Sequence, residues 1–249
     1  MSAVLQTRKL CKRFGALVVA ANIDFALEPG ARHALIGPNG AGKTTFVNLL
    51  TGRLEPSSGS VMLGGEDVSA RSSAERVKRG LGRTFQINTL FGNMSVLDNV
   101  ALGVAERSGR AGNWWRPAKA HAEVQDEALQ LLASLGIADD APRRVLDLPY
   151  GKQRLVEIAI ALGLRPKVLL LDEPAAGVPK EESERILDAL DKLPAEIAIL
   201  IIEHDMELVF RFAKRITVLV QGEVLCEGTP HEIEHDPRVR EVYLGESHG

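Results

Sequence analysis

The residues best suited to chemistry in this 249-residue chain lie in one glycine-rich segment. It matches the pattern G-x-x-x-x-G-K-S/T, whose glycines let the backbone curl until several N–H groups point at one phosphate. The helix expected to follow adds its positive N-terminal end, and the lysine supplies a point charge to the β- and γ-phosphates. The expected nucleotide-binding residues of this segment are Gly37, Pro38, Asn39, Gly40, Ala41, Gly42, Lys43, Thr44 and Thr45.

A pair of acids follows the short apolar run 168–171. Such a run is typical of a buried parallel strand, and ligands of open α/β sheets bind at the carboxyl ends of their strands. We expect Asp172 to hold Mg²⁺ together with the Thr44 hydroxyl, and Glu173 to polarise the attacking water. Two acids in a surface turn are the alternative, which the presence of the phosphate loop in the same chain disfavours. The two motifs together predict a P-loop NTPase.

The elements that position these residues alternate between apolar runs and helix-like segments, which predicts an α/β fold with a mostly parallel sheet. The middle of the chain instead has helical periodicity without a clear strand, so we expect an inserted helical subdomain at 88–163, with 1–87 and 164–249 as the core. The predicted strands are 31–36, 59–63, 81–86, 168–171, 197–202, 216–220 and 223–227, and the predicted helices include 43–50, 96–104, 120–135 and 181–193.

Composition narrows the class of protein. The formal net charge of −3 argues against a nucleic-acid partner bound by bulk electrostatics. The polar, basic segment 1–14 does not resemble a signal peptide, and the run 197–202 is too short to cross a bilayer. Cys11 and Cys226 have no zinc or redox spacing, so we expect two reduced thiols. Any work at a membrane must therefore go through a partner.

A third segment narrows the family. The run Leu148-Pro149-Tyr150-Gly151-Lys152-Gln153-Arg154 precedes a helical pattern at 155–164 and resembles the signature segment of ABC transporter ATPases. The resemblance implies the ABC ATPase fold, with an antiparallel β portion near the N-terminus. It also implies a dimer in which this segment contacts ATP held by the phosphate loop of the other subunit. The residues expected to do so are Tyr150, Gly151, Lys152 and Gln153.

Other segments match the same family in the same order. Gln86 resembles the Q-loop glutamine, which reaches Mg²⁺ and the catalytic water and links the site to the membrane subunit. His204 resembles the switch histidine that contacts the γ-phosphate. Phe14 stands at the sequence position where the family has the aromatic residue that stacks on adenine. The resemblance implies that ATP and Mg²⁺ are the cofactors. The implied catalytic set is Lys43, Gln86, Glu173 and His204, and the implied metal ligands are Thr44, Gln86 and Asp172.

Two positions depart from the family pattern. Pro149 stands where a serine often bonds the γ-phosphate, and Pro179 stands where an aspartate is common. We expect backbone amides near Gly151 to carry more of the cross-dimer phosphate contact.

The whole arrangement is most similar to the LivG-type ATPases of branched-chain amino acid importers. The supporting segments are 83–86, 150–154, 175–177 and the tail 239–245. This resemblance implies integral membrane permease subunits, a second identical or related ATPase subunit, and an indirect link to a periplasmic or extracellular solute-binding protein. The chain would then lie on the cytoplasmic, inner face of the membrane. Urea or amide importers, lipopolysaccharide export, a soluble ABC ATPase and a non-hydrolysing regulator are the alternatives.

Two further sequence patterns are not assigned to the predicted site. The run His231-Glu232-Ile233-Glu234-His235 matches the zinc-protease pattern H-E-x-x-H, but Pro230 and Pro237 bracket it, and we expect a short solvated helix. Trp114-Trp115, in a predicted loop at 108–117, fits either a membrane contact or packing of the insertion on its own domain.

Overall fold

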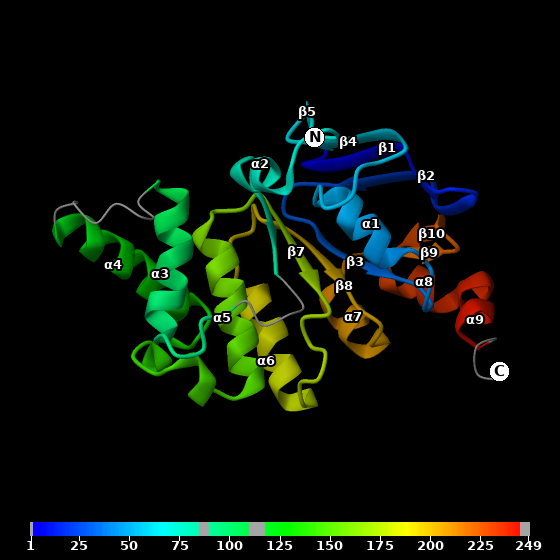
Figure 1. Cartoon of the computed structure of the whole chain (residues 1–249). Coiled ribbons are helices and arrows are strands. Elements are labelled where there is room, and N and C mark those ends of the chain that lie inside the picture. Colours follow the sequence, from blue (N-terminus) through cyan, green and yellow to red (C-terminus); the bar gives the residue numbers. More distant parts are fainter. Residues whose placement is uncertain (1, 85–89, 110–117, 245–249) are drawn as a thin grey trace.

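The computed structural model describes residues 2–84, 90–109 and 118–244. Within these ranges the chain forms two sheets flanked by helices (Figure 1). The strands are β1 (Leu5–Phe14), β2 (Leu17–Leu27), β3 (Arg32–Ile36), β4 (Ser58–Leu63), β5 (Glu66–Asp67), β6 (Leu81–Arg83), β7 (Val168–Asp172), β8 (Ala198–Ile202), β9 (Arg215–Val220) and β10 (Glu223–Gly228). The α-helices are α1 (Lys43–Leu50), α2 (Ser73–Lys78), α3 (Val96–Arg107), α4 (Ala118–Ser134), α5 (Tyr150–Gly163), α6 (Lys180–Asp191), α7 (Met206–Phe212), α8 (Pro230–His235) and α9 (Pro237–Leu244).

The larger sheet has the order β10-β9-β3-β8-β7-β6. All its pairings are parallel except the β9–β10 hairpin, which confirms the mostly parallel sheet and the predicted hairpin. Every residue of β7 and β8 is buried, and this is why both strands are nearly continuous apolar runs. The segments that follow β3, β7 and β8 therefore leave the sheet at one edge, where the predicted catalytic residues begin.

The smaller sheet, with the order β2-β1-β4-β5, is antiparallel and uses the N-terminal strands, as expected. Helix α1 packs between the two sheets. Its residues Phe46, Val47, Leu49 and Leu50 are buried in a cluster with side chains of both. The ring of Phe46 packs edge-on against the ring of Phe25 in β2, with 5.6 Å between the ring centroids. Burial on both sides fixes the helix that follows the phosphate loop.

The far end of α1 is closed by Arg76 of α2, whose side chain is 1% exposed. Its guanidinium donates to the carbonyl oxygens of Leu49 at 2.6 Å and Leu50 at 2.7 Å. It also donates to the carbonyls of Ser69 and Arg71. The carbonyls of Leu49 and Leu50 lie in the last turn of α1, where Leu49 also accepts the Gly52 N–H at 3.4 Å, and Arg76 stabilises this helix end by supplying charged donors.

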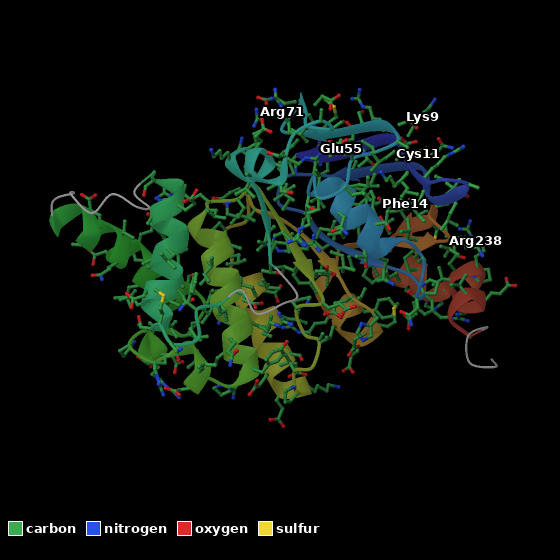
Figure 2. The ribbon with its side chains drawn as sticks, in the orientation of Figure 1. Lys9, Cys11, Phe14, Glu55, Arg71 and Arg238 are labelled. Atoms are coloured by element: carbon green, nitrogen blue, oxygen red, sulfur yellow. The ribbon has the colours of Figure 1, made fainter. Side chains whose placement is uncertain are left out.

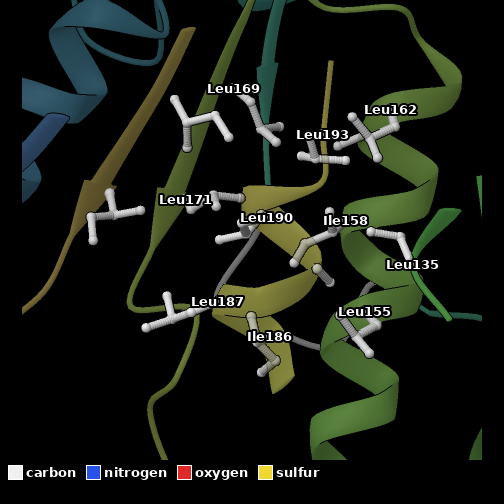
Figure 3. Close-up of a cluster of buried hydrophobic side chains, with 14 of the residues drawn as sticks. Leu135, Leu155, Ile158, Leu162, Leu169, Leu171, Ile186, Leu187, Leu190 and Leu193 are labelled. Carbon is white, nitrogen blue, oxygen red and sulfur yellow. The ribbon is translucent and has the colours of Figure 1, made fainter. Parts of the chain in front are cut away.

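Helices α3, α4 and α5 stand together at one end of the molecule (Figure 1). Figure 3 shows that Leu155, Ile158 and Leu162 of α5 face α6, which in turn packs on β7. One continuous apolar cluster thus joins the helical part to the large sheet. The division into 88–163 and a core of 1–87 plus 164–249 stays a prediction.

Several expected boundaries shift. The strand expected at 81–86 ends at Arg83, although the Thr84 N–H still bonds the Leu170 carbonyl at 3.0 Å. The helix expected from Leu155 begins at Tyr150, because Pro149 provides its N-cap with an extended backbone. The residue pair Trp114-Trp115 lies outside the described residues.

The segment with the zinc-protease pattern is the six-residue helix α8, as expected of a short surface helix. Glu232 serves its N-terminus, accepting from the backbone N–H of Thr229 at 2.7 Å in a capping box. Across the described ranges, no three acid, histidine or cysteine side chains come together as a metal site. Nor is any helix there long and apolar enough to cross a bilayer.

A buried histidine links β3 to the hairpin. His33 Nε2 lies 2.8 Å from the hydroxyl of Thr217, which donates to Glu227 at 3.1 Å. Because the Thr217 proton is used on Glu227, the His33 ring must donate through Nε2. Burial lowers the pKa of His33 from 6.5 to about 4, with Glu227 opposing this shift and Arg215 adding to it.

We therefore expect acid to destabilise the fold through His33. A group with a depressed folded-state pKa stabilises fully above its unfolded value near 6.5, and that contribution is lost as the pH falls through about 4. At about 1.4 kcal/mol per unit, the loss is about 3 kcal/mol. Denaturant unfolding of wild type and His33→Gln across this range measures it, and the variant should lose less. An equal pH dependence of both proteins would contradict the assignment.

Candidate active site

The phosphate-loop segment joins the carboxyl end of β3 to α1. Lys43 folds back over the loop, and its Nζ donates to the carbonyl oxygens of Gly37 and Pro38, the latter at 2.9 Å. The N-cap of α1 is Gly42, which forms no side-chain cap, and the first turn of α1 carries no acid. The N–H groups of this turn can therefore receive an anion, which the helix dipole favours.

Glycine is required at two positions of the loop. Gly37 has φ 156° and Gly42 has φ 98°, both in the region that L side chains avoid. A Cβ on Gly37 would lie 2.1 Å from the carbonyl oxygen of Leu219, and one on Gly42 would lie 2.8 Å from that of Val19. The loop is thus held closely between β9 and β2.

Phe14 ends β1 at the tip of the hairpin that continues into β2 (Figure 2). The ring is 52% exposed, and Lys12 Nζ lies 5.1 Å from its centroid. Because Val19 of the same hairpin contacts the phosphate loop, the hairpin borders the expected nucleotide site. An exposed ring in this place suits stacking on a planar base.

The buried acid at the end of β7 has a counterion. Arg83 Nη2 donates to Asp172 Oδ2 at 2.9 Å, and both side chains are less than one-tenth exposed. Through Nη1, Arg83 also donates to Asn48 of α1 at 3.1 Å. Within the described chain its Nε has no hydrogen-bond partner. One guanidinium therefore ties the expected metal ligand to the helix that follows the phosphate loop.

The two expected catalytic residues that follow β7 and β8 lie side by side. Glu173 has φ 47°, and its N–H bonds the Ile202 carbonyl of β8 at 2.9 Å. A positive φ is costly for this residue type and turns its side chain away from the strand direction. Glu173 Oε1 lies 3.8 Å from His204 Nδ1. Both side chains are open to solvent, at 33% and 66% exposure.

The signature segment opens α5, and its side chains find partners within the chain. Lys152 pairs with Asp140 at 2.6 Å, and Gln153 donates to the Leu148 carbonyl at 3.0 Å. The Tyr150 hydroxyl accepts from Arg154 at 2.5 Å. The Gly151 N–H donates to Glu182 of α6 at 3.1 Å. An N–H at the start of α5 thus already binds a carboxylate, which shows that this position suits an anion.

Residues 20–176 of the sequence match the family model described as ABC transporter. The chain belongs to the ABC transporter family. A second model, described as branched-chain amino acid ATP-binding cassette transporter, matches residues 223–249 of this cassette.

Curated relatives of the cassette carry the same description. It is 39% identical over 98% of both chains to LivG of Escherichia coli (strain K12), a high-affinity branched-chain amino acid transport ATP-binding protein. It is 36% identical over 98% of both chains to BraF of Pseudomonas aeruginosa, which has the same function in its name.

Solved cassettes share the fold. A crystal structure of the ADP conformation of an ATP-binding cassette of an ABC transporter superposes with a TM-score of 0.87 at 29% identity, covering 98% of this chain and 100% of that one. A dimeric bacterial ABC transporter cassette gives 0.76 at 25% identity, covering 91% and 98%. The expected ABC ATPase fold is confirmed.

The structure brings the phosphate loop, Asp172, Glu173 and His204 of the cassette to one sheet edge, whereas Gln86 lies outside the described residues. Sequence reasoning missed two charged residues at this edge, Arg83 and Glu203. Arg83 is the last residue of β6 and lies inside the segment 83–86 already quoted, and Glu203 directly precedes His204. A charged residue at the end of a buried strand was the signal available.

Proposed function

We propose that this cassette is the ATP-hydrolysing subunit of a membrane importer and that the transported solutes are branched-chain amino acids. The observation that carries the proposal is the 39% identity over 98% of both chains to LivG. The model matched at residues 223–249 supports the same solute class. The site geometry supports a triphosphate substrate, since the loop, the acids and the histidine meet at one edge.

The proposed roles follow from the chemistry of each group. The amides of the phosphate loop and Lys43 bind the β- and γ-phosphates, and Phe14 stacks on the base. Glu173 accepts the proton of the attacking water, and His204 contacts the γ-phosphate. Gln86 would join the site to a membrane subunit.

Mg²⁺ fits the residues present. Asp172 and the Thr44 hydroxyl offer oxygen ligands, which this ion prefers, with the Gln86 amide oxygen as a third. A site with one carboxylate, and no three-ligand cluster among the described residues, suits an ion held jointly with substrate phosphates. When bound, Mg²⁺ neutralises charge on those phosphates. Arg83 leaves the second oxygen of Asp172 for it, because the ion pair uses Oδ2.

The partners follow from the signature segment. Tyr150, Gly151, Lys152 and Gln153 would contact ATP bound by a second cassette, identical or related. Pro149 offers no hydroxyl, so the Gly151 N–H is the group at this position that can reach phosphate. Permease subunits would bind the dimer on the inner face of the membrane, and an external solute-binding protein would act indirectly.

Transport by the reconstituted complex tests the proposal. The cassette is purified with candidate permease subunits and a candidate solute-binding protein and placed in liposomes loaded with Mg-ATP. We expect ATP-dependent uptake of leucine, isoleucine or valine. Uptake of urea or a short amide instead would refute the proposed solute class but would support the proposed importer function. A cassette that has no affinity for Mg-ATP would refute the function as a whole.

A further inference from the structure

A buried carboxylate lies directly behind the two expected catalytic side chains. Glu203 follows the last residue of β8, and the residue is 2% exposed. Neither the phosphate loop nor the predicted set of catalytic residues uses it. A carboxyl group placed this deep beside a reaction site needs an explanation, because taking a charge out of water is costly.

The two oxygens of Glu203 hold two different segments. Oε1 accepts the N–H of Ala175, at 3.2 Å, in the loop that follows Glu173. Oε2 accepts the N–H of His204, at 3.3 Å. The side chain therefore connects the loop after β7 to the segment after β8 at the position where each carries a catalytic group.

Among the described residues the connection is made by backbone donors and not by a salt bridge with a lysine or arginine. In the described chain the one ion pair of Glu203 is with His204, whose Nδ1 lies 3.9 Å from Oε2. Burial raises the pKa of Glu203 above its ordinary value. The two backbone hydrogen bonds and the charge of His204 oppose the rise, and the charge of Glu173 adds to it. An ionised Glu203 is thus a cost to the fold, which its two N–H donors offset only in part.

We propose that Glu203 is a positioning residue for ATP hydrolysis, whose carboxylate bridges the loop of Glu173 and the segment of His204 and fixes their spacing. The proposal rests on the catalytic roles given to Glu173 and His204 above. A bridge of this kind needs two acceptor oxygens on one side chain. Glutamine has the same shape but one acceptor and one donor, so it can serve only one of the two N–H groups.

The variant Glu203→Gln in the reconstituted transporter tests this role. We expect kcat for ATP hydrolysis to fall about 10- to 100-fold, because a small misplacement of reacting groups costs that much. KM for ATP should change less than about 2-fold, since the phosphate loop determines binding. Glu207→Gln is the matched control, because it makes the same change four residues later on a side chain that is 71% exposed.

Stability separates positioning from a structural role. A carboxyl group with a raised folded-state pKa stabilises the fold below its unfolded pKa, and that stability is lost as the pH rises through the raised value. At a pH above that raised value the ionised group is therefore unfavourable. We expect Tm of Glu203→Gln at such a pH to equal or exceed that of wild type while kcat falls. A structural role would lower Tm and kcat together.

The pH profile supplies the last readout. As the pH falls through the raised pKa of Glu203, wild type should lose kcat because a protonated carboxyl no longer holds both N–H groups, and Glu203→Gln should lack this decline. Turnover of Glu203→Gln equal to that of Glu207→Gln, or an unchanged pH profile, would overturn the proposal. A wild-type complex that hydrolyses no ATP would instead overturn the proposed function.

Discussion

Replacing Glu173 by glutamine is expected to leave ATP bound and reduce its turnover by roughly 10²- to 10⁴-fold, the usual contribution of a general base. Glutamine keeps the shape of the side chain and the backbone bond from residue 173 to the Ile202 carbonyl. It cannot accept a proton from water. His204, whose Nδ1 lies 3.8 Å from the replaced carboxylate, would keep its proposed contact with the γ-phosphate but would not substitute for the base.

Equilibrium binding of ATP and steady-state phosphate release measure the two halves of this prediction. Glu181→Gln, at an exposed residue in the first turn of α6, is the control, and it should match wild type in both measurements. Turnover by Glu173→Gln at the rate of the control would remove Glu173 from its role. Loss of ATP binding would show that Glu173 contributes mainly to the binding of ATP and not to the hydrolysis step.

The second large effect concerns the buried pair of Arg83 and Asp172. Changing Arg83 to methionine leaves Asp172, which is 7% exposed, without its counterion. Removing one member of a buried pair costs about 3 to 5 kcal/mol of unfolding free energy. The link from β7 to α1 through Asn48 is lost at the same time.

Chemical denaturation of three variants separates charge from packing. Arg83→Met should lose about 3 to 5 kcal/mol of unfolding free energy. Arg83→Met combined with Asp172→Leu should recover most of this loss, because an apolar pair leaves no buried charge. Arg79→Met breaks an ion pair with Glu66, which is 70% exposed, and should cost about 1 kcal/mol or less. Equal losses for Arg79→Met and Arg83→Met would contradict the importance of burial.

The parts of the site found in the sequence are those whose chemistry depends on local geometry. The phosphate loop needs glycine, lysine and threonine within eight positions because one turn of backbone does the binding. Asp172 and Glu173 are visible because an apolar strand ends directly before them.

The parts that sequence reasoning missed depend on contacts across the fold. Arg83 meets Asp172 across 89 residues, and Glu203 meets Ala175 across 28. No spacing of residues along the sequence predicts such long-range pairs. The first and last residues of β1 were equally hard to predict from the sequence. The pairing of β1 with β2 shifts register between Thr7 and Leu10, and this shift breaks the alternation of buried and exposed side chains expected of a strand.

The contact between Gly151 and Glu182 has a thermodynamic consequence for the signature segment. In the single chain the Gly151 N–H is already satisfied by a carboxylate oxygen at 3.1 Å. Any other anion that takes this N–H does so by exchange, and the net gain is only the difference between two charge-assisted hydrogen bonds. Glu182 is already partly exposed, and the hydration that its displaced carboxylate regains is part of that difference.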